Sequence, residues 1–204
     1  MARYTGPKNR VARKFGTNIF NRLRNPLLHK PNPPGVHGAR RRKKSDYGLQ
    51  LEEQQKLRAI YGMISRKQLH RYYKEASNQK GNTNELFLQA LETRLDIAIY
   101  RLKIASTIFA AQQLVSHGHI LVNGKRVDRR SFRVRPGMTI SLKEKSKKHP
   151  QIITSLEGAR EMPEYYTFDI AGLSGQLTSL PEADQIPIPL VNVPLVCQFI
   201  AHSS

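Results

Sequence analysis

The chain has 204 residues, which is enough for about one or two ordinary domains. It carries 34 Lys and Arg against 15 Asp and Glu, and this net charge of +19 points to a polyanionic partner. A single cysteine, Cys197, excludes an intramolecular disulfide framework and a cysteine-based structural zinc site. Because the start lacks an apolar signal region and no stretch of about 18 residues is continuously apolar, we expect a cytoplasmic protein with no membrane partner.

The charge is distributed unevenly along the chain. Residues 1–45 hold 13 basic and no acidic side chains, and residues 104–149 hold 10 basic and 2 acidic ones. Residues 150–204 hold 1 basic and 6 acidic side chains. RNA phosphates repel carboxylates, so we expect the acidic tail to face protein or solvent. Its acids are Glu157, Glu161, Glu164, Asp169, Glu182 and Asp184.

The first block, residues 1–45, is predicted to be an extended basic arm. Its apolar residues are sparse, and four prolines between positions 26 and 34 interrupt any long helix. The run from Arg40 to Lys44 repels itself and stays open until it meets an anion. A solvated tail and an arm that orders on a polyanion are both open interpretations. Aromatic residues among the cations either stack on unpaired bases or pack against the protein: Tyr4, Phe15, Phe20 and Tyr47.

Residues 46–93 are predicted to form a helical domain. A first helix is expected over 47–61, with Asp46 as its cap. The spacing from Ser65 onward is typical of a capping box and predicts the start of a second helix. Apolar residues at helical spacing predict a third helix over 84–101.

Residues 94–155 are predicted to form a compact unit in which two helices pack against a small antiparallel sheet. A short helix is expected over 107–117. Asn123-Gly124 then stands between two apolar runs, and it favours a β-hairpin because a type I′ turn needs positive φ at both central residues. Two further strands are expected, at 132–134 and 138–142.

The C-terminal segment, residues 156–204, is predicted to complete the helical domain. We expect a helix over 150–160 and a hairpin built from 165–170 and 176–180. The apolar run 195–200 is expected to dock on a core. The predicted fold class is therefore α+β, with the unit at 94–155 inserted into a helical domain that carries the arm.

The sequence contains few catalytic signals. No nucleotide-binding loop or nucleophile elbow occurs, and no carboxylate or cysteine close in sequence completes a metal site with His117 and His119. Arg94-Leu95-Asp96 is similar to a triplet of some pseudouridine synthases, in which the Asp is the nucleophile. Here apolar residues at helical spacing follow it, so an ion pair between Asp96 and a neighbouring Arg is favoured. We expect neither enzymatic activity nor a cofactor.

A set of motifs lies between residues 94 and 142: Arg94-Leu95-Asp96, Gln113-Leu114-Val115, His117-Gly118-His119-Ile120, Val122-Asn123-Gly124 and Ser131-Phe132. Together they resemble the S-four RNA-binding domain. Ribosomal proteins, tyrosyl-tRNA synthetases and pseudouridine synthases share this module. It implies RNA binding but no particular task.

The flanking motifs are more specific: Ala2-Arg3-Tyr4-Thr5-Gly6-Pro7-Lys8, Pro34-Gly35-Val36-His37-Gly38, Tyr72-Tyr73-Lys74-Glu75-Ala76 and Lys80-Gly81-Asn82-Thr83. With them, residues 1–149 resemble the ribosomal protein S-four family of the bacterial or organellar small subunit. Some members hold zinc in the arm through four cysteines. Asn9 and Ala12 stand at the first two of those places, so the chain resembles the zinc-free form and no metal is expected.

The resemblance implies a structural constituent of the small ribosomal subunit. Family members bind a junction in the 5′ domain of 16S rRNA early in subunit assembly. With ribosomal proteins S-five and S-twelve they influence translational accuracy, and with S-three and S-five they line the mRNA entry path. Two alternatives stay open on the residues alone: an RNA-modifying enzyme of the pseudouridine synthase type and a general nucleic-acid packaging protein.

The RNA-binding residues are predicted from charge and from the resemblance. Each would neutralise a phosphate and release counterions, while specificity would come from RNA shape. In the arm they are Arg3, Lys8, Arg10, Arg13, Lys14, His37, Arg40, Arg41, Arg42, Lys43 and Lys44. In the body they are Arg58, Arg66, Arg71, Lys74, Arg94, Arg101, Lys125, Arg126, Arg129 and Arg133.

Overall fold

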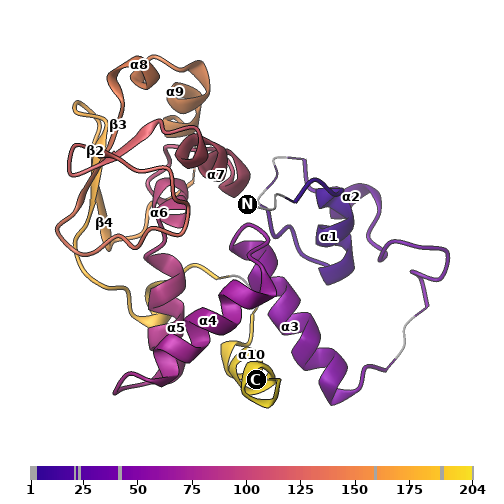
Figure 1. Ribbon diagram of the computed structural model, residues 1–204. Helices are drawn as coiled ribbons and strands as arrows, with labels where there is room; N and C mark the ends of the chain where they lie inside the picture. The colour runs from indigo at the N-terminus through magenta and orange to yellow at the C-terminus, as the bar shows by residue number, and fades with distance from the viewer. Residues whose placement is uncertain are drawn as a thin grey trace. The chain divides into compact units, whose positions relative to one another are not determined.

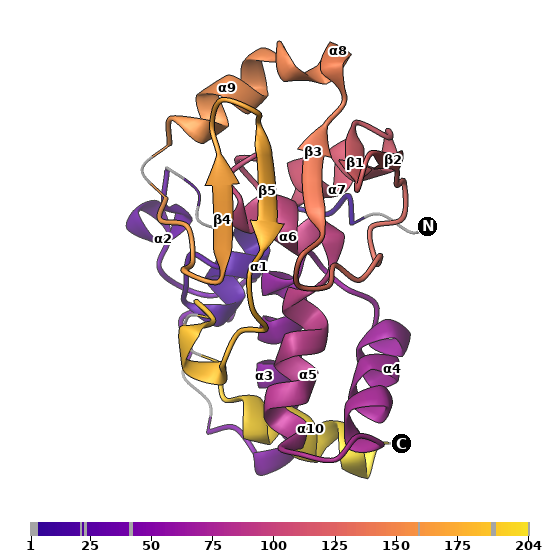
Figure 2. The same cartoon turned by 90° about the vertical axis from the view of Figure 1, so that its left-hand side faces the viewer.

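The computed structural model describes residues 4–20, 22, 24–40, 43–158, 160–188 and 191–203. The chain divides into two compact units. Residues 1–74 and 188–204 form the N-terminal unit, and residues 75–187 form the central unit. Figures 1 and 2 label the helices and strands of both.

The N-terminal unit is helical in its described residues. Its helices are α1 (Lys8–Phe15), α2 (Pro26–His29), α3 (Asp46–Ile60), the greater part of α4 (Arg66–Ser77) and α10 (Val193–His202). Ser45, rather than the predicted Asp46, caps α3, since its hydroxyl accepts a hydrogen bond from Gly48 N at 3.2 Å. The Ser65 hydroxyl accepts a hydrogen bond from Gln68 N at 3.2 Å, which confirms the predicted start of α4.

The core of the N-terminal unit lies between α3 and α10. Leu57 on α3 and Phe199 and Ile200 on α10 are almost completely shielded from solvent. Removal of this apolar surface from water stabilises the pairing of two segments far apart in the sequence. The predicted docking of residues 195–200 on a core is confirmed.

The arm is less extended than predicted. Residues 8–15 form α1, which ends at Gly16 in the left-handed conformation. The Arg13 Nε group donates hydrogen bonds to the carbonyl oxygens of Lys30 at 3.1 Å and Asn32 at 3.0 Å. Ala12 is buried on the helix. A sparsely apolar segment therefore folds locally because side-chain hydrogen bonds connect its ends.

The central unit combines helices with a five-stranded sheet. Its helices are α5 (Thr83–Glu92), α6 (Leu95–Arg101), α7 (Ile108–Ser116), α8 (Glu144–Lys147), α9 (Pro150–Leu156) and the 3-10 helix η1 (Ala183–Gln185). Its strands are β1 (Ile120–Val122), β2 (Lys125–Arg126), β3 (Thr139–Leu142), β4 (Tyr166–Asp169) and β5 (Ser174–Leu177). The strand order is β2-β1-β3-β5-β4, and every neighbouring pair is antiparallel (Figure 2).

The core of the central unit lies between the sheet and the helix pair α6 and α7. Leu95 and Ile99 from α6 and Val115 from α7 pack with Ile120 and Ile140 from the strands. This arrangement of two helices against a small antiparallel sheet confirms the predicted α+β class.

The sheet approaches α6 closely at Gly175 on β5. A Cβ atom added there would lie 2.6 Å from the Leu102 side chain. A larger residue would have to displace the buried Leu102 side chain, which follows α6.

The predicted helix over 84–101 is interrupted in the structure, which forms α5 and α6 separately. The segment at 132–134 binds the intervening backbone: Val134 N donates to Thr93 O at 2.7 Å, and Leu95 N donates to Phe132 O at 2.9 Å. The predicted strand at 132–134 is only an isolated bridge between Arg94 and Arg133. These backbone bonds come from a distant segment, so local periodicity does not reveal them.

The C-terminal segment also differs from the prediction. The predicted hairpin is present as β4 and β5, but β5 pairs with β3, so it extends the sheet of the central unit rather than the helical domain. The predicted helix over 150–160 ends at Leu156 as α9. Among the described residues, no helix is long and apolar enough to cross a membrane.

Candidate nucleic-acid interface

The β1–β2 hairpin presents two cations at the edge of the central sheet. Its turn has φ of 48° at Asn123 and 76° at Gly124, which confirms the predicted type I′ geometry. The Asn123 Oδ1 atom accepts a hydrogen bond from Thr139 N at 2.9 Å and ties the turn to β3. Lys125 and Arg126 are exposed on β2. The hairpin is therefore a fixed platform for two positive side chains.

The Arg126 guanidinium lies against the backbone of Gly118. A Cβ atom at Gly118 would lie 2.2 Å from Arg126 Nε, and the φ of Gly118 is 72°. The position favours glycine for its backbone conformation, and a side chain here would have to displace the Arg126 guanidinium. This packing restricts the Arg126 side chain while its residue stays exposed to solvent.

Arg129 extends the positive edge beyond the hairpin. It is exposed in the loop after β2. Within the part of the chain that the structure describes, no carboxylate bonds to Lys125, Arg126 or Arg129. These three side chains, which we call the hairpin cations, are available to an external anion.

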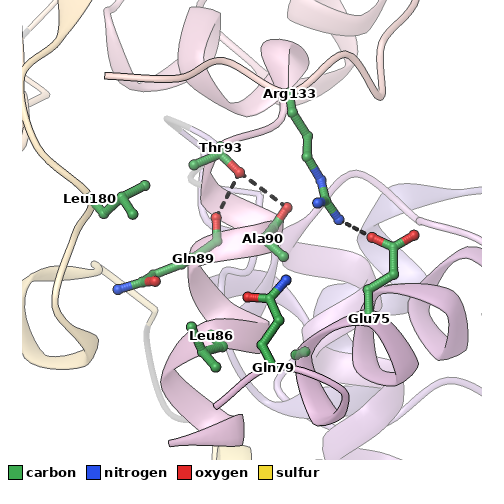
Figure 3. Close-up of a pocket in the computed structure, with 9 residues that line it drawn as sticks. Glu75, Gln79, Leu86, Gln89, Ala90, Thr93, Arg133 and Leu180 are labelled. Atoms are coloured by element: carbon green, nitrogen blue, oxygen red, sulfur yellow. Dashed lines mark hydrogen bonds and ion pairs between the residues drawn. The ribbon is translucent and has the colours of Figure 1, made fainter. Parts of the chain in front are cut away.

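Arg133 has a partner inside the central unit. Its Nη2 atom forms an ion pair with the Glu75 carboxylate, and both side chains are about two-fifths exposed, at 42% and 39%. Figure 3 shows Arg133 reaching down to Glu75 at a pocket of about 120 Å³, which Gln79, Gln89 and Thr93 also line. An RNA phosphate would have to compete with Glu75 for this guanidinium.

Arg94 and Asp96 form a buried ion pair. The Nε and Nη2 atoms of Arg94 donate to the two carboxylate oxygens of Asp96 at 3.0 and 2.7 Å. Arg94 is 4% exposed and Asp96 is 0% exposed. Gln112 also donates to Asp96, at 3.3 Å, and accepts from Arg130 at 3.2 Å. The structure thus places Arg94 away from solvent and confirms the favoured structural interpretation of Asp96.

Arg101 is likewise engaged within the fold. Its guanidinium donates to both carboxylate oxygens of the buried Glu92, at 3.2 and 2.5 Å. The Tyr166 hydroxyl donates to Glu92 O at 3.3 Å. Burial, followed by the Glu92 charge, raises the pKa of Tyr166 well above its usual range. Arg101 therefore neutralises a buried acid, and its own side chain is only 11% exposed.

The predicted arm cations differ in their surroundings. Arg10 is exposed, whereas Arg13 binds backbone carbonyls of the arm. The Lys14 ammonium donates to Gln55 Oε1 at 2.5 Å. Burial lowers the pKa of Lys8, and repulsion from the Arg22 charge lowers it further. Further along the arm, exposed predicted residues are His37, Arg40, Lys43 and Lys44, of which Lys44 pairs with Glu52. Arg3, Arg41 and Arg42 lie outside the described residues.

The predicted cations of α3 and α4 are partly used for packing. The Arg58 Nε group donates to Ile64 O at 2.8 Å, and burial together with Arg66 lowers the pKa of Arg58. Arg66 donates to His70 Nε2 at 3.2 Å. The Arg71 guanidinium lies 5.6 Å from the Tyr72 ring centroid, and Lys74 is exposed. Arg66, Arg71 and Lys74 thus remain on the surface of the helix.

Two of the aromatic residues considered for base stacking, Phe20 and Tyr47, differ in burial. Phe20 is 6% exposed. The Tyr47 and Phe199 ring centroids are 5.4 Å apart. Phe20 therefore follows the packing interpretation, whereas Tyr47 contacts Phe199 but is 64% exposed, so both interpretations of its ring stay open.

The central unit holds a second basic group, which the predicted site residues do not include. Lys143 follows β3, and His117, His119 and His149 lie near it. The sequence favours a structural role for His117 and His119, because no carboxylate or cysteine close in sequence completes a metal site with them. His149 is distant from them in sequence and comes close to them only because the chain folds back after β3.

Known families cover both parts of this architecture. Residues 3–92 match the family described as Ribosomal protein S4/S9 N-terminal domain, and residues 93–140 match the S4 domain. The Small ribosomal subunit protein uS4 of Protochlamydia amoebophila (strain UWE25) is 63% identical over 206 residues and covers 100% of both chains. The chain belongs to the uS4 family. Its members are ribosomal proteins of the small subunit.

Other uS4 relatives are similar to this chain along its whole length. The protein of Chlamydia trachomatis serovar L2 is 62% identical over 208 residues, and that of Chlamydia pneumoniae is 59% identical over 208 residues. Each match covers 99% of both chains. The predicted type is bacterial or organellar, and these bacterial sources support the bacterial one.

Membership of the uS4 family also decides two broader predictions. The chain is a structural ribosomal protein and not an RNA-modifying enzyme, in agreement with the hydrogen-bonded, buried state of Asp96. The predicted location at the cytoplasmic ribosome follows from the same membership.

Proposed function

We propose that the chain binds the five-way junction in the 5′ domain of 16S rRNA as a primary binder and nucleates assembly of the small subunit body. The observation that carries this proposal is the set of hairpin cations, which the S4 domain exposes and which have no carboxylate partner among the described residues. Their charges would replace condensed counterions at RNA phosphates, and release of those ions favours binding.

The arm and α4 extend the proposed RNA contact. We assign to it the exposed cations Arg10, Arg40, Lys43, Arg66, Arg71 and Lys74, together with His37. Because side chains read A-form grooves poorly, specificity would come from the shape of the folded junction. Arg94 and Arg101 contribute by stabilising the domain that presents the other cations.

The acidic tail is proposed to face neighbouring proteins or solvent. All six of its acids are exposed: Glu157, Glu161, Glu164, Asp169, Glu182 and Asp184. We propose S-five, S-three and S-twelve as protein neighbours, an influence on translational accuracy through S-five and S-twelve, and a place along the mRNA entry path. Crosslinking within assembled subunits tests these assignments, and dense crosslinks from the tail acids to rRNA would contradict them.

The hairpin cations provide the direct test of RNA binding. Lys125→Gln, Arg126→Gln and Arg129→Gln should together weaken binding to a 5′-domain rRNA fragment and reduce the slope of log affinity against log salt by about 2 to 3. Lys80→Gln, in an exposed loop before α5, is the control and should leave the slope nearly unchanged. An unchanged slope in the triple variant would refute this interface.

A further inference from the structure

Three histidines line one hollow in the central unit. The hollow has a volume of about 130 Å³ and lies among the α6–α7 connection, the end of α7, the start of β1 and the start of α9. Its polar lining comes from His117, His119, His149, Gln113, Gln151 and Ser106. Ile104 and Ile152 are among the apolar residues that also line it.

Backbone hydrogen bonds hold the main chain at each of the three histidines. His117 N donates to Gln113 O at 2.9 Å at the end of α7, and His119 N donates to Leu114 O at 3.1 Å. His149 N donates to Ser146 O at 3.1 Å. The rings of His117 and His119 have centroids 6.1 Å apart. The three imidazoles therefore line one hollow from held backbone positions, with His119 half-buried and His117 and His149 exposed.

One ring nitrogen of His119 is already engaged. Its Nδ1 atom lies 2.8 Å from the Ser146 hydroxyl. This hydrogen bond orients the ring and leaves Nε2 as the nitrogen for an external ligand.

The charged groups around His119 are all basic. Burial lowers the pKa of His119, followed by the charges of His117, His149, Lys143 and Arg126. These residues belong to the end of α7, the start of α9, the end of β3 and β2. The acid on neighbouring α8, Glu144, is exposed and pairs with Lys147 at 2.7 Å. The site thus concentrates positive charge, and among the described residues the charges that act on His119 are those of basic groups.

We propose that this hollow binds a phosphate group of RNA and takes up protons when it does so. Protonated imidazoles and the neighbouring Lys and Arg would donate charge-assisted hydrogen bonds to phosphate oxygens. The proposal rests on the RNA-binding function proposed above and adds a pH-dependent contact to it. Among the described residues, no three His, Cys, Asp or Glu side chains are arranged to hold a metal ion.

The direction of the pH effect follows from linkage. In the absence of a ligand, mutual repulsion and burial keep His119 neutral near pH 7. A bound phosphate reverses the balance and favours the protonated ring. Binding therefore consumes protons, and RNA affinity should rise as pH falls.

The test compares RNA affinity at two pH values at constant salt. Between about pH 7.5 and about pH 5.5, the unmodified chain should bind the 5′-domain fragment about tenfold more tightly, since one pKa unit corresponds to a factor of ten. The variant His117→Gln/His119→Gln/His149→Gln should lose most of this gain and keep its affinity at the higher pH within a small factor. His202→Gln, on α10, is the control and should keep the full gain.

The outcomes distinguish failure of this proposal from failure of the proposed binding to 5′-domain rRNA. If the triple variant keeps the full pH gain, the hollow is not the protonated site. If the unmodified chain fails to select the 5′-domain fragment even at the higher pH, the proposed function fails instead. His149→Gln alone, at an exposed position before α9, keeps the comparison possible if the triple variant does not fold, and it should lose part of the gain.

A second experiment identifies the source of the phosphate. NMR signals of the three imidazoles should shift on addition of the RNA fragment and respond little to inorganic phosphate at the same phosphate concentration. A strong response to inorganic phosphate with none to RNA would overturn the assignment to RNA.

Discussion

Asp96 provides the strongest residue-scale prediction because its carboxylate compensates the buried charge of Arg94. Asp96→Asn leaves that guanidinium without its counter-charge. Loss of one partner of a buried pair typically costs about 3–5 kcal/mol, so we expect a loss of this size in the free energy of unfolding. Urea unfolding followed by circular dichroism measures it.

An exposed pair supplies the control for Asp96. Glu144→Gln breaks the pair with Lys147, in which the Glu144 side chain is 84% exposed. Solvent screening limits such pairs to below about 1 kcal/mol. Equal losses in the two variants would show that burial does not determine the strength of the Arg94 pair.

His119 makes the stability of the RNA-free chain depend on pH. Burial and neighbouring cations lower its pKa in the folded state from the ordinary 6.5. The unfolded chain therefore binds protons more readily, so the free energy of unfolding should fall as pH falls below 6.5. Thermal unfolding across this range should show a smaller decline in His119→Gln. A steeper decline in that variant would contradict the sign of the effect.

Charge in the sequence predicts a polyanionic partner but does not sort the individual cations. Arg94 and Arg126 each count as one positive charge in the sequence. In the structure, Arg94 is buried against Asp96, whereas Arg126 is exposed on β2. The Arg94-Leu95-Asp96 triplet alone suggested the ion pair. Glu92 and Arg101 are nine residues apart, so only the break between α5 and α6 brings their charges together.

Gly118 and Gly124 give a matched test at the scale of the β1–β2 element. Both have positive φ, so each Gly→Ala change should cost about 1–2 kcal/mol in backbone strain. A Cβ atom at Gly118 meets the Arg126 guanidinium, whereas one at Gly124 meets open space. Gly118→Ala should therefore displace Arg126 and weaken RNA binding more than Gly124→Ala does.

Filter binding at constant salt, combined with thermal unfolding, separates the two effects. The glycine variants should show similar losses of stability and different losses of affinity. Equal affinities would mean that the position of Arg126 against Gly118 does not matter for RNA binding.

Elements with strong local signals were predictable from the sequence. The Asn123-Gly124 turn and the Ser65 cap depend on neighbouring residues, and both are confirmed. The end of α5 was not predictable, because distant backbone groups at 132–134 bind residues 93–95 in place of helical hydrogen bonds. The apolar period continues across the break and so favours one helix over two.

At the scale of the whole molecule, the boundaries of the units depend on long-range pairing. The pairing of Ile140 with Gly175 joins β3 to β5 and draws the tail hairpin into the central sheet. Alternating residues predict a hairpin but not its partner strand. The docking of the apolar run 195–200 was easier to predict, since its packing on α3 needs only one apolar helix face.

Selective recognition of a folded rRNA junction is the central claim at this scale. The net charge of +19 ensures some affinity for any nucleic acid, so affinity alone does not support the claim. The purified chain should therefore be titrated, over a range of salt concentrations, with the 5′-domain fragment of 16S rRNA, an unrelated structured RNA of equal length and duplex DNA.

We predict tighter binding to the 5′-domain fragment than to either competitor, with the preference retained as salt weakens all three interactions. This outcome would mean that RNA shape adds to the counterion effect. Equal affinity for all three nucleic acids, with one common salt slope, would contradict the account and favour a general nucleic-acid packaging protein.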